Sequence, residues 1–370
     1  MNSPFISRRY FMQTCLAASL SSSLRGAIAS DNFAGACAVL TGAVERGEMA
    51  SAVLHVAQGE HKLTKAFGKA RSEDAMFLLG SISKPVAMTA LMTLFDKGAF
   101  SLEDPLKKFF PGFSGGGRET VTLQHVLTHV SGLPDQLPQN DALRRGHSPL
   151  SAFIEQALQV PLQFSPGSRY EYSSMGILLA ARVAEIISGS DILSLVQKSV
   201  FEPLGMRHSA QGLGRFALGE LEQVQTNFAA PEAGGGAPDS KNWDWNSPYW
   251  RALGAPWGGT HASAPDIGTF LAEFLHQRGR VLKAETARRM IRNHNKADQT
   301  PRGLAFNVGV DSGSPGCSEK TFGHSGSTGT LAWADPETQI ICVVLTSLPG
   351  RAVNPHPRDL ASAKIAAAGK

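Results

Sequence analysis

The chain has 370 residues, of which 42% are hydrophobic, and its formal net charge is +4. This composition is that of a globular protein long enough for two domains or one elaborate domain. No cluster of Lys and Arg with interleaved aromatic residues indicates a nucleic-acid partner, and beyond the first 30 residues no apolar stretch approaches the roughly 20 residues that span a bilayer.

The first 30 residues have the features of an export signal. They contain adjacent Arg8 and Arg9, no acidic residue, and the small-residue pattern Ala-Ile-Ala at positions 27–29. The stretch Ser-Arg-Arg-Tyr-Phe-Met resembles the twin-arginine class of signal, and an ordinary amphipathic start is the alternative. We therefore expect residues 1–30 to be a twin-arginine export signal and the mature protein to be periplasmic or extracellular. Removal of the signal would lower the net charge to +1, because it contains three arginines.

The mature chain is predicted to begin with a helix and a β-hairpin. Helical periodicity covers residues 33–45, and residues 51–56 and 62–67 have the pattern of two strands around a Gln-Gly turn. Farther on, the Pro- and Gly-rich stretch 110–117 indicates a boundary.

Ser81 and Lys84 form the candidate chemical centre, directly before an apolar helix predicted over residues 86–95. Positions i and i+3 share a helix face, with side chains about 5–6 Å apart, so the lysine amine can reach the serine hydroxyl. Burial against the apolar helix would favour the neutral amine, which can take the proton of a nucleophilic serine. The alternative is that Ser81 or Ser83 is an ordinary N-cap.

The middle of the chain is predicted to be helical and to end in a long loop. Helical periodicity occurs at residues 123–129, 149–159, 176–187 and 192–200. The loop at residues 231–259 holds four of the five tryptophans: Trp243, Trp245, Trp250 and Trp257. Two roles stay open for this loop, since its aromatic side chains could wall an acyl pocket or pin the loop to the core.

The last part of the chain returns to strands. Residues 265–277 and 284–293 are predicted to be helices, 304–310, 321–325, 330–334 and 340–345 strands, and 360–368 a final helix. We expect a two-domain α/β (α+β) protein, with an antiparallel sheet built from both chain ends and flanked by helices. Residues 31–115 and 245–370 would form the discontinuous α/β domain. Residues 116–244 would form an inserted all-helical domain with the aromatic-rich loop at its end.

Five segments in register resemble serine hydrolases of the family that includes class C β-lactamases, D,D-peptidases (penicillin-binding proteins) and related esterases. They are Phe-Leu-Leu-Gly-Ser-Ile-Ser-Lys-Pro at 77–85, Thr-Leu-Gln-His-Val-Leu-Thr-His-Val-Ser-Gly-Leu at 122–133, and the stretches at 166–174, 201–206 and 323–330. The resemblance covers most of residues 33–350 and implies the β-lactamase/transpeptidase-like fold.

The resemblance also implies a role for each matching residue. Ser81 would form the acyl-enzyme, Lys84 would accept its proton, and Tyr172 would relay protons. His324, Ser325 and Gly326 match the edge-strand motif that flanks the site in this family. The backbone N–H groups of Ser81 and Ser327 would form the oxyanion hole.

One departure from the family pattern concerns the substrate. Two positions after the tyrosine, β-lactamases and D,D-peptidases have asparagine, whereas this chain has Ser174. A hydroxyl is too short to contact both the lysine and the acylamide group of a substrate, and His324 holds a carboxylate less firmly than lysine does. We expect a small-molecule acyl substrate, an ester in preference to a D-Ala peptide or lactam. A non-catalytic protein that binds peptidoglycan or lactams is the alternative of another class.

Other chemistries find little support in the sequence. His125 and His129 have the i, i+4 spacing of zinc ligands but lack the glutamate of the metalloprotease motif, so we expect neither a metal nor any other cofactor. No serine has the Gly-x-Ser-x-Gly setting of an α/β-hydrolase. The three mature cysteines, Cys37, Cys317 and Cys342, are expected to be free and buried. The oligomeric state is not indicated.

Overall fold

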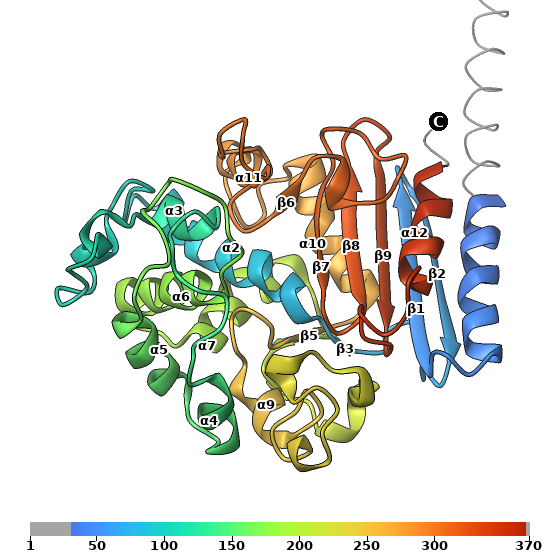
Figure 1. The fold of residues 1–370 in the computed structure, drawn as a ribbon. Helices are drawn as coiled ribbons and strands as arrows, with labels where there is room; N and C mark the ends of the chain where they lie inside the picture. The colour runs from blue at the N-terminus through green and yellow to red at the C-terminus, as the bar shows by residue number, and fades with distance from the viewer. Residues whose placement is uncertain (1–30, 368–370) are drawn as a thin grey trace, which may run out of the picture.

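A six-stranded sheet forms the larger layer of the computed structural model, which describes residues 31–367 (Figure 1). Its strand order is β2-β1-β9-β8-β7-β6, and every neighbouring pair is antiparallel. The prediction of an antiparallel sheet built from both chain ends is confirmed. The strands are β1 (Ser51–Gln58), β2 (His61–Gly68), β6 (Asn307–Val308), β7 (Phe322–Gly326), β8 (Thr330–Asp335) and β9 (Ile340–Thr346).

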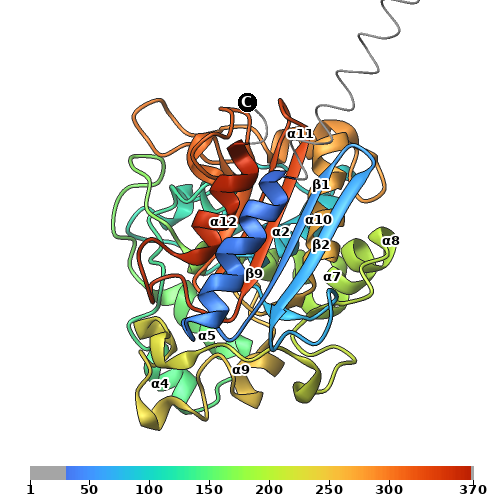
Figure 2. The same ribbon diagram turned by 90° about the vertical axis from the view of Figure 1, so that its right-hand side faces the viewer.

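The two faces of this sheet are both buried because side chains alternate along each strand. In β1, Leu54 points to the face covered by α12 (Pro357–Ala366) and by the helix at residues 31–45. Val53 points to the other face, where α10 (Ala264–His276) packs. Figure 2 shows α12 and the first helix lying side by side over the sheet. The helix expected at residues 33–45 is thus confirmed as one of the outer layers.

Helix α2 (Ser83–Asp96) occupies the middle of the molecule, between the sheet and the helical region (Figure 1). All of its residues from Ser83 to Leu94 are buried, as expected of a helix that is surrounded by other elements. It packs against α6 (Ser174–Ser188). The helical region around it also contains α3 (Leu123–Leu127), α4 (Asn140–Arg145), α5 (Leu150–Gln159), α7 (Ile192–Val196) and α8 (Glu202–Leu204). The domain boundaries expected at residues 116 and 244 stay a prediction.

A second, three-stranded sheet was not predicted. It has the order β3-β5-β4, with strands Phe77–Leu78, Thr260–Ala262 and Ser209–Gln211. Strands of two or three residues are too short to show a period-2 pattern, which explains why sequence periodicity missed them. Their consequence is local: β3 ends at Leu78, two residues before Gly80, and so fixes the approach of the chain to Ser81.

Several boundaries differ from those predicted. The strand expected at 304–310 is reduced to β6, because Leu304, Ala305 and Phe306 enter the hydrophobic core without pairing. The helix expected at 192–200 begins as α7 and continues as a π-helical turn at Gln197–Phe201 (η4). The helix expected at 284–293 ends early, as α11 (Ala284–Met290). The long aromatic loop contains α9 (Pro248–Leu253).

Two predictions about cysteines and export have different outcomes. Cys37, Cys317 and Cys342 are free and buried, as expected. The expected export signal lies outside the described residues. Within residues 31–367, no helix combines the length and the apolar character needed to cross a bilayer.

Because both faces of the sheet are buried, we expect core substitutions in its strands to destabilise the protein. Replacing Leu54, which is completely buried, with alanine should lower the free energy of unfolding by about 2–5 kcal/mol, because a cavity replaces packed atoms. Leu63 on the neighbouring strand is 37% exposed, so Leu63→Ala should change the free energy of unfolding by less than about 0.5 kcal/mol. Urea unfolding of both variants checks this, and equal losses would contradict the burial described for β1.

Candidate active site

Ser81 and Lys84 are brought together as the sequence predicted. Ser81 lies in a 3₁₀ turn, η1 (Gly80–Ile82), and Lys84 lies in the first turn of α2. The Lys84 Nζ donates hydrogen bonds to Ser81 Oγ at 3.1 Å and to the Trp257 carbonyl at 3.0 Å. The N-cap alternative is wrong, since Ile82 is the N-cap and no side chain caps the helix. Ser83 Oγ instead accepts the Thr260 N–H.

The Lys84 amine is almost entirely removed from water, with 1% of the residue exposed. Burial lowers its pKa to about 7, and the positive charge of Arg302 acts in the same direction. The carboxylates of Asp135 and Glu232 partly oppose this shift. About half of the molecules would therefore carry a neutral amine near pH 7, and a neutral amine can accept the proton of Ser81.

Tyr172 completes a compact group around the serine. Lys84 Nζ lies 4.7 Å from the centre of the Tyr172 ring, and the ring of His129 packs on the tyrosine at 4.6 Å between centroids. The Tyr172 hydroxyl is buried without a hydrogen-bond partner among the described residues. Burial raises the pKa of this phenol, and the charge of Arg302 and the nearby Ser81 hydroxyl lower it. Tyr172 is therefore a neutral phenol whose hydroxyl lies close to that of Ser81.

Strand β7, which β6 pairs only at Phe322 and Gly323, runs beside the serine and leads into the turn that holds Ser327. Gly80 has φ +58°, and a Cβ there would lie 3.2 Å from Ser327 N and 3.0 Å from Thr328 Oγ1. Glycine is required at this position both for its backbone conformation and for this close approach. The Ser327 N–H, free of hydrogen bonds to the described residues, thus lies next to the nucleophile turn.

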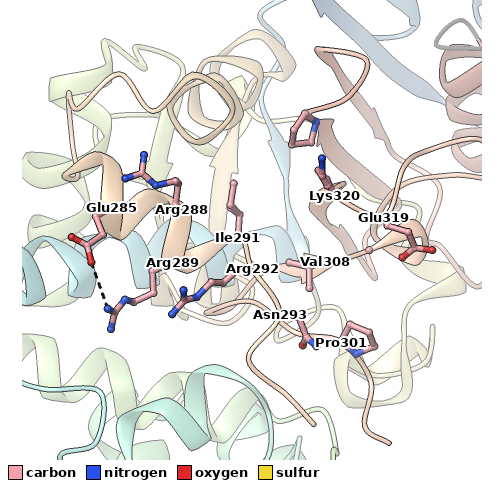
Figure 3. Close-up of a pocket in the computed structure, with 12 residues that line it drawn as sticks. Glu285, Arg288, Arg289, Ile291, Arg292, Asn293, Pro301, Val308, Glu319 and Lys320 are labelled. Carbon is pink, nitrogen blue, oxygen red and sulfur yellow. Dashed lines mark ion pairs between the residues drawn. The ribbon is translucent and has the colours of Figure 1, made fainter. Parts of the chain in front are cut away.

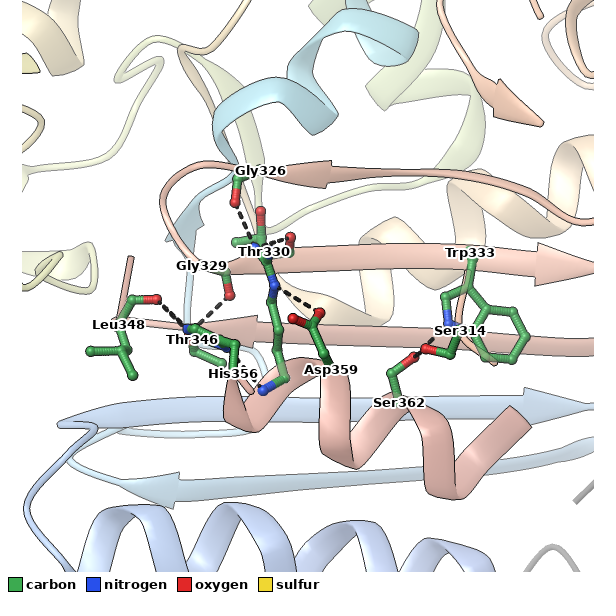
Figure 4. A network of polar contacts seen from close by, with 11 residues as sticks. Ser314, Gly326, Gly329, Thr330, Trp333, Thr346, Leu348, His356, Asp359 and Ser362 are labelled. Carbon is green, nitrogen blue, oxygen red and sulfur yellow. Dashed lines mark hydrogen bonds and ion pairs between the residues drawn. The ribbon is translucent and has the colours of Figure 1, made fainter. Parts of the chain in front are cut away.

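Three side chains fasten the β7–β8 turn to its surroundings. The hydroxyls of Thr328 and Thr330 donate to the carbonyls of Leu78 and Leu79, at 2.7 and 2.6 Å. Arg358 on α12 donates to the carbonyls of Gly326 and Thr330, at 2.8 and 3.1 Å. Figure 4 shows Gly326 and Thr330 at the two ends of this turn, above α12. The position of Ser327 is therefore set by hydrogen bonds from two sides.

His324 is buried and uncharged. Its Nδ1 is 2.7 Å from the Ser325 carbonyl, and its Nε2 has no partner among the described residues. Burial, together with the charges of Arg302 and Lys84, holds the pKa of this imidazole well below its usual range. The sequence analysis expected His324 to hold a carboxylate less firmly than lysine does, and the structure goes further, since a buried neutral imidazole offers a substrate carboxylate no cation.

Ser174 is hydrogen-bonded to the carboxylate of Asp135, a residue that the sequence analysis missed. Its hydroxyl and its backbone N–H both donate to Asp135 Oδ1, at 2.6 and 2.9 Å. The Ser174 hydroxyl therefore points to Asp135, and the charge of that carboxylate reaches Lys84. Asp135 lies two residues beyond the 122–133 stretch, and no spacing rule singles it out.

Arg302 is the second residue that the sequence analysis missed. It is 4% exposed, and its guanidinium lies 5.3 Å from the centre of the Tyr172 ring and 5.7 Å from that of Tyr170. The guanidinium also donates to the side chain of Asn307. A buried cation beside Tyr172 lowers the pKa of the groups around it, including Lys84 and His324. It stands in an irregular segment without periodicity, so no local signal was available.

The aromatic loop is tightly packed. Trp243, Trp245, Trp250 and Trp257 are each no more than 4% exposed. Trp257 contacts Trp250 edge to face, and its backbone carbonyl accepts the hydrogen bond from Lys84. Arg144 stacks over the Trp250 ring at 3.7 Å. This burial supports the packing role, and it makes the loop a support for the lysine.

The two histidines with zinc-like spacing have separate structural contacts. His125 Nδ1 accepts the Thr122 N–H in a capping box, and His129 Nδ1 accepts the Ser173 N–H at 3.1 Å. In the part of the chain that the structure describes, no three His, Cys, Asp or Glu side chains gather as metal ligands. His129 supports the Tyr172 segment through both its ring and its nitrogen.

The antiparallel sheet, the buried α2 and the Ser81–Lys84 pair at its start define the chain as a serine hydrolase. The sequence matches the model of the beta-lactamase family over residues 38–367, and the chain belongs to that family. The resemblance drawn from the five sequence segments is thereby confirmed.

Similar proteins include esterases and peptidases. "Esterase EstB" of Burkholderia gladioli is 32% identical over 155 residues, which span 38% of this chain and 39% of that esterase. "Putative D-alanyl-D-alanine carboxypeptidase" of Escherichia coli (strain K12) is 25% identical over 327 residues, 77% of this chain and 75% of that protein. A penicillin-binding protein homologue from Caulobacter crescentus shares the fold with a TM-score of 0.75 at 21% identity, covering 92% of this chain and 98% of its own.

The depressed pKa of Lys84 predicts a pH dependence. Below about pH 7 the amine is protonated and cannot accept the serine proton, so kcat/KM should rise with pH and level off above this value. A pH–rate profile on a neutral acyl substrate measures this rise, which is the acidic limb of the profile. Lys84→Met should lose about 10²- to 10⁴-fold in kcat/KM at every pH. A limb centred near 10 would contradict the buried neutral amine.

The charge of Asp135 predicts a shift of the acidic limb of this pH–rate profile. Asp135→Asn removes a negative charge that favours the ammonium form of Lys84, so the acidic limb should shift to lower pH. The amide oxygen can still accept both hydrogen bonds from Ser174. Ser174→Ala is the matched control, because it removes the hydroxyl contact and keeps the carboxylate, and its limb should stay in place. Equal shifts in both variants would contradict the electrostatic role.

Proposed function

We propose that this protein is an exported carboxylesterase-like hydrolase that acts through an acyl-enzyme on Ser81. The observation that carries the proposal is the hydrogen bond between Ser81 Oγ and a buried lysine amine with a pKa of about 7. Neutral Lys84 takes the hydroxyl proton while Ser81 Oγ forms a bond to the ester carbonyl carbon. The carbonyl oxygen then carries the negative charge.

The backbone N–H groups of Ser81 and Ser327 stabilise that oxygen. Preorganised donors of this kind typically contribute about 2.7–4 kcal/mol each to the stability of the transition state. When the tetrahedral intermediate collapses, the bond to the leaving alcohol breaks, and its oxygen receives a proton. Tyr172, whose ring centre is 4.7 Å from Lys84 Nζ and whose hydroxyl lies near that of Ser81, passes the proton from the lysine to the leaving oxygen. Water then attacks the acyl-enzyme by the reverse sequence, which releases the carboxylic acid.

The polar groups around the serine favour an ester over a lactam or a D-Ala peptide. Ser174 is hydrogen-bonded to Asp135 and presents no amide to an acylamide group. His324 is neutral and gives a substrate carboxylate no charged partner on β7. An ester requires none of these contacts.

A D,D-peptidase or lactamase is the second candidate. It is favoured by the E. coli relative named "Putative D-alanyl-D-alanine carboxypeptidase", whose match extends over 77% of this chain. Like the first candidate it uses Ser81 covalently, so the two differ in substrate and share the mechanism. A non-catalytic binding protein would retain the fold without turnover.

Export is part of the proposal and depends on residues 1–30. Their adjacent arginines, the absence of acidic residues and the small-residue pattern at 27–29 support a twin-arginine signal. A mature protein beginning near residue 31 would start with the first helix that covers the sheet.

Two measurements on the purified protein test the proposed activity. A fluorophosphonate probe should add its mass to the wild-type protein and not to Ser81→Ala, which separates a working serine from a non-catalytic binder. A short-chain p-nitrophenyl ester should then be hydrolysed with at least about tenfold higher kcat/KM than a chromogenic cephalosporin, a difference of about 1.4 kcal/mol in the barrier. The reverse ranking would replace the esterase by the lactamase candidate.

A further inference from the structure

A cavity of about 660 Å³ opens between α11 and β6. Its volume lies in the range of small-molecule sites, about 300–1,000 Å³. The residues that line it include neither Ser81, Lys84 nor Tyr172, so it is not the catalytic cleft. It shares a wall with the active site, because the Asn293 side chain that lines it accepts the backbone N–H of Arg302 at 2.9 Å.

The wall of this cavity is rich in cations that lack a firm carboxylate partner. Arg288 donates to the neutral side chain of Gln277 at 2.7 Å, and Arg292 has no hydrogen bond or ion pair with any described residue. Arg289 is 3.8 Å from Glu285, whose side chain is 78% exposed, and exposed pairs of this kind are weak. The positive charges of Arg288 and Arg292 are therefore not neutralised by a carboxylate of the protein.

The remaining charges leave the cavity positive. Lys320 and Glu319 stand on the side opposite the arginines, and Glu319 lies at the far end of the cavity (Figure 3). Lys320 pairs with Glu337 at 3.3 Å, both of them exposed. The lining thus contains four cationic and two acidic side chains: Arg288, Arg289, Arg292, Lys320, Glu285 and Glu319.

Between the two charged sides lies an apolar surface. Ile291 and Val308 occupy the middle of the view in Figure 3, and Pro301 and Pro336 extend the same lining. Guanidinium groups bind carboxylates and phosphates in a fork geometry, whereas an apolar surface gains from covering by hydrocarbon. A free inorganic anion would leave the apolar part in water, and a neutral hydrocarbon would leave the arginines without a partner.

We infer that this cavity is a second ligand site, which binds an amphiphilic anion whose carboxylate or phosphate head meets Arg288 and Arg292 and whose hydrocarbon chain covers Ile291 and Val308. The inference does not depend on the proposed function, because none of these residues takes part in the chemistry at Ser81.

Isothermal titration calorimetry of the full mature chain with decanoate tests this site. Wild type and Ser81→Ala should bind alike, and Arg288→Glu combined with Arg292→Glu should weaken binding by at least about tenfold, since charge-assisted contacts are replaced by repulsion. Arg278→Glu is the matched control, because Arg278 is exposed on the neighbouring loop and does not line the cavity, and it should bind like the wild type.

Three further ligands define the chemistry. Decyl phosphate tests the choice of head group. The tighter binder of decyl phosphate and decanoate identifies the preferred anion, and either ranking supports the site. Decanol should bind at least about tenfold more weakly, and inorganic phosphate should not bind measurably. Decanoate affinity that survives the double substitution, or equal binding of decanol, would overturn the inference. Thermal unfolding of each variant verifies that it is folded, and Arg292→Gln replaces the double variant if that one is unstable.

Discussion

The hydrogen bond between a serine hydroxyl and a lysine amine that is kept out of water is the interaction on which the rest of this structure depends. Lys84 can act as a base only because burial in α2 lowers the pKa of its ammonium group to about 7. The surrounding charges adjust that value in opposite directions, with Arg302 favouring the neutral amine and Asp135 the charged one. The protein thus sets the reactivity of Ser81 by excluding water from the neighbouring amine, and the charges of Arg302 and Asp135 adjust the pKa of that amine.

The fold keeps this amine beside an anion-stabilising turn by joining segments far apart in the sequence. Gly80 permits the close approach of the β7–β8 turn, and the Thr328 and Thr330 hydroxyls hold that turn to β3 and the residue after it. Arg358, contributed by the last helix, fixes the same turn from the other side. Stability and activity are coupled here, because the strands that fill the core on both faces of the sheet also carry the groups that surround the nucleophile.

The parts of this site that could be predicted from sequence are those whose residues are near one another in the chain or stand in a recurrent order. Ser81 and Lys84 are one helical turn apart, and the strands at both chain ends are long enough to show alternation. Asp135 and Arg302 escaped prediction because each reaches Lys84 only through the packing of α6 or of an irregular segment. The small β3-β5-β4 sheet escaped because strands of two or three residues carry no periodic signal. The shortened β6 escaped because buried apolar residues in a coil have the same composition as a strand.

Where β-lactamases and D,D-peptidases have an asparagine, Ser174 presents a hydroxyl that is hydrogen-bonded to Asp135, and the charge of that carboxylate raises the pKa of Lys84. The direct test of the central claim is therefore the ionisation of Lys84 itself. NMR titration of the protein with ¹³Cε-labelled lysine, with Lys84→Arg to assign the resonance, should show one lysine titrating near pH 7. A Lys84 signal that titrates near the ordinary value of about 10.4 would contradict the account.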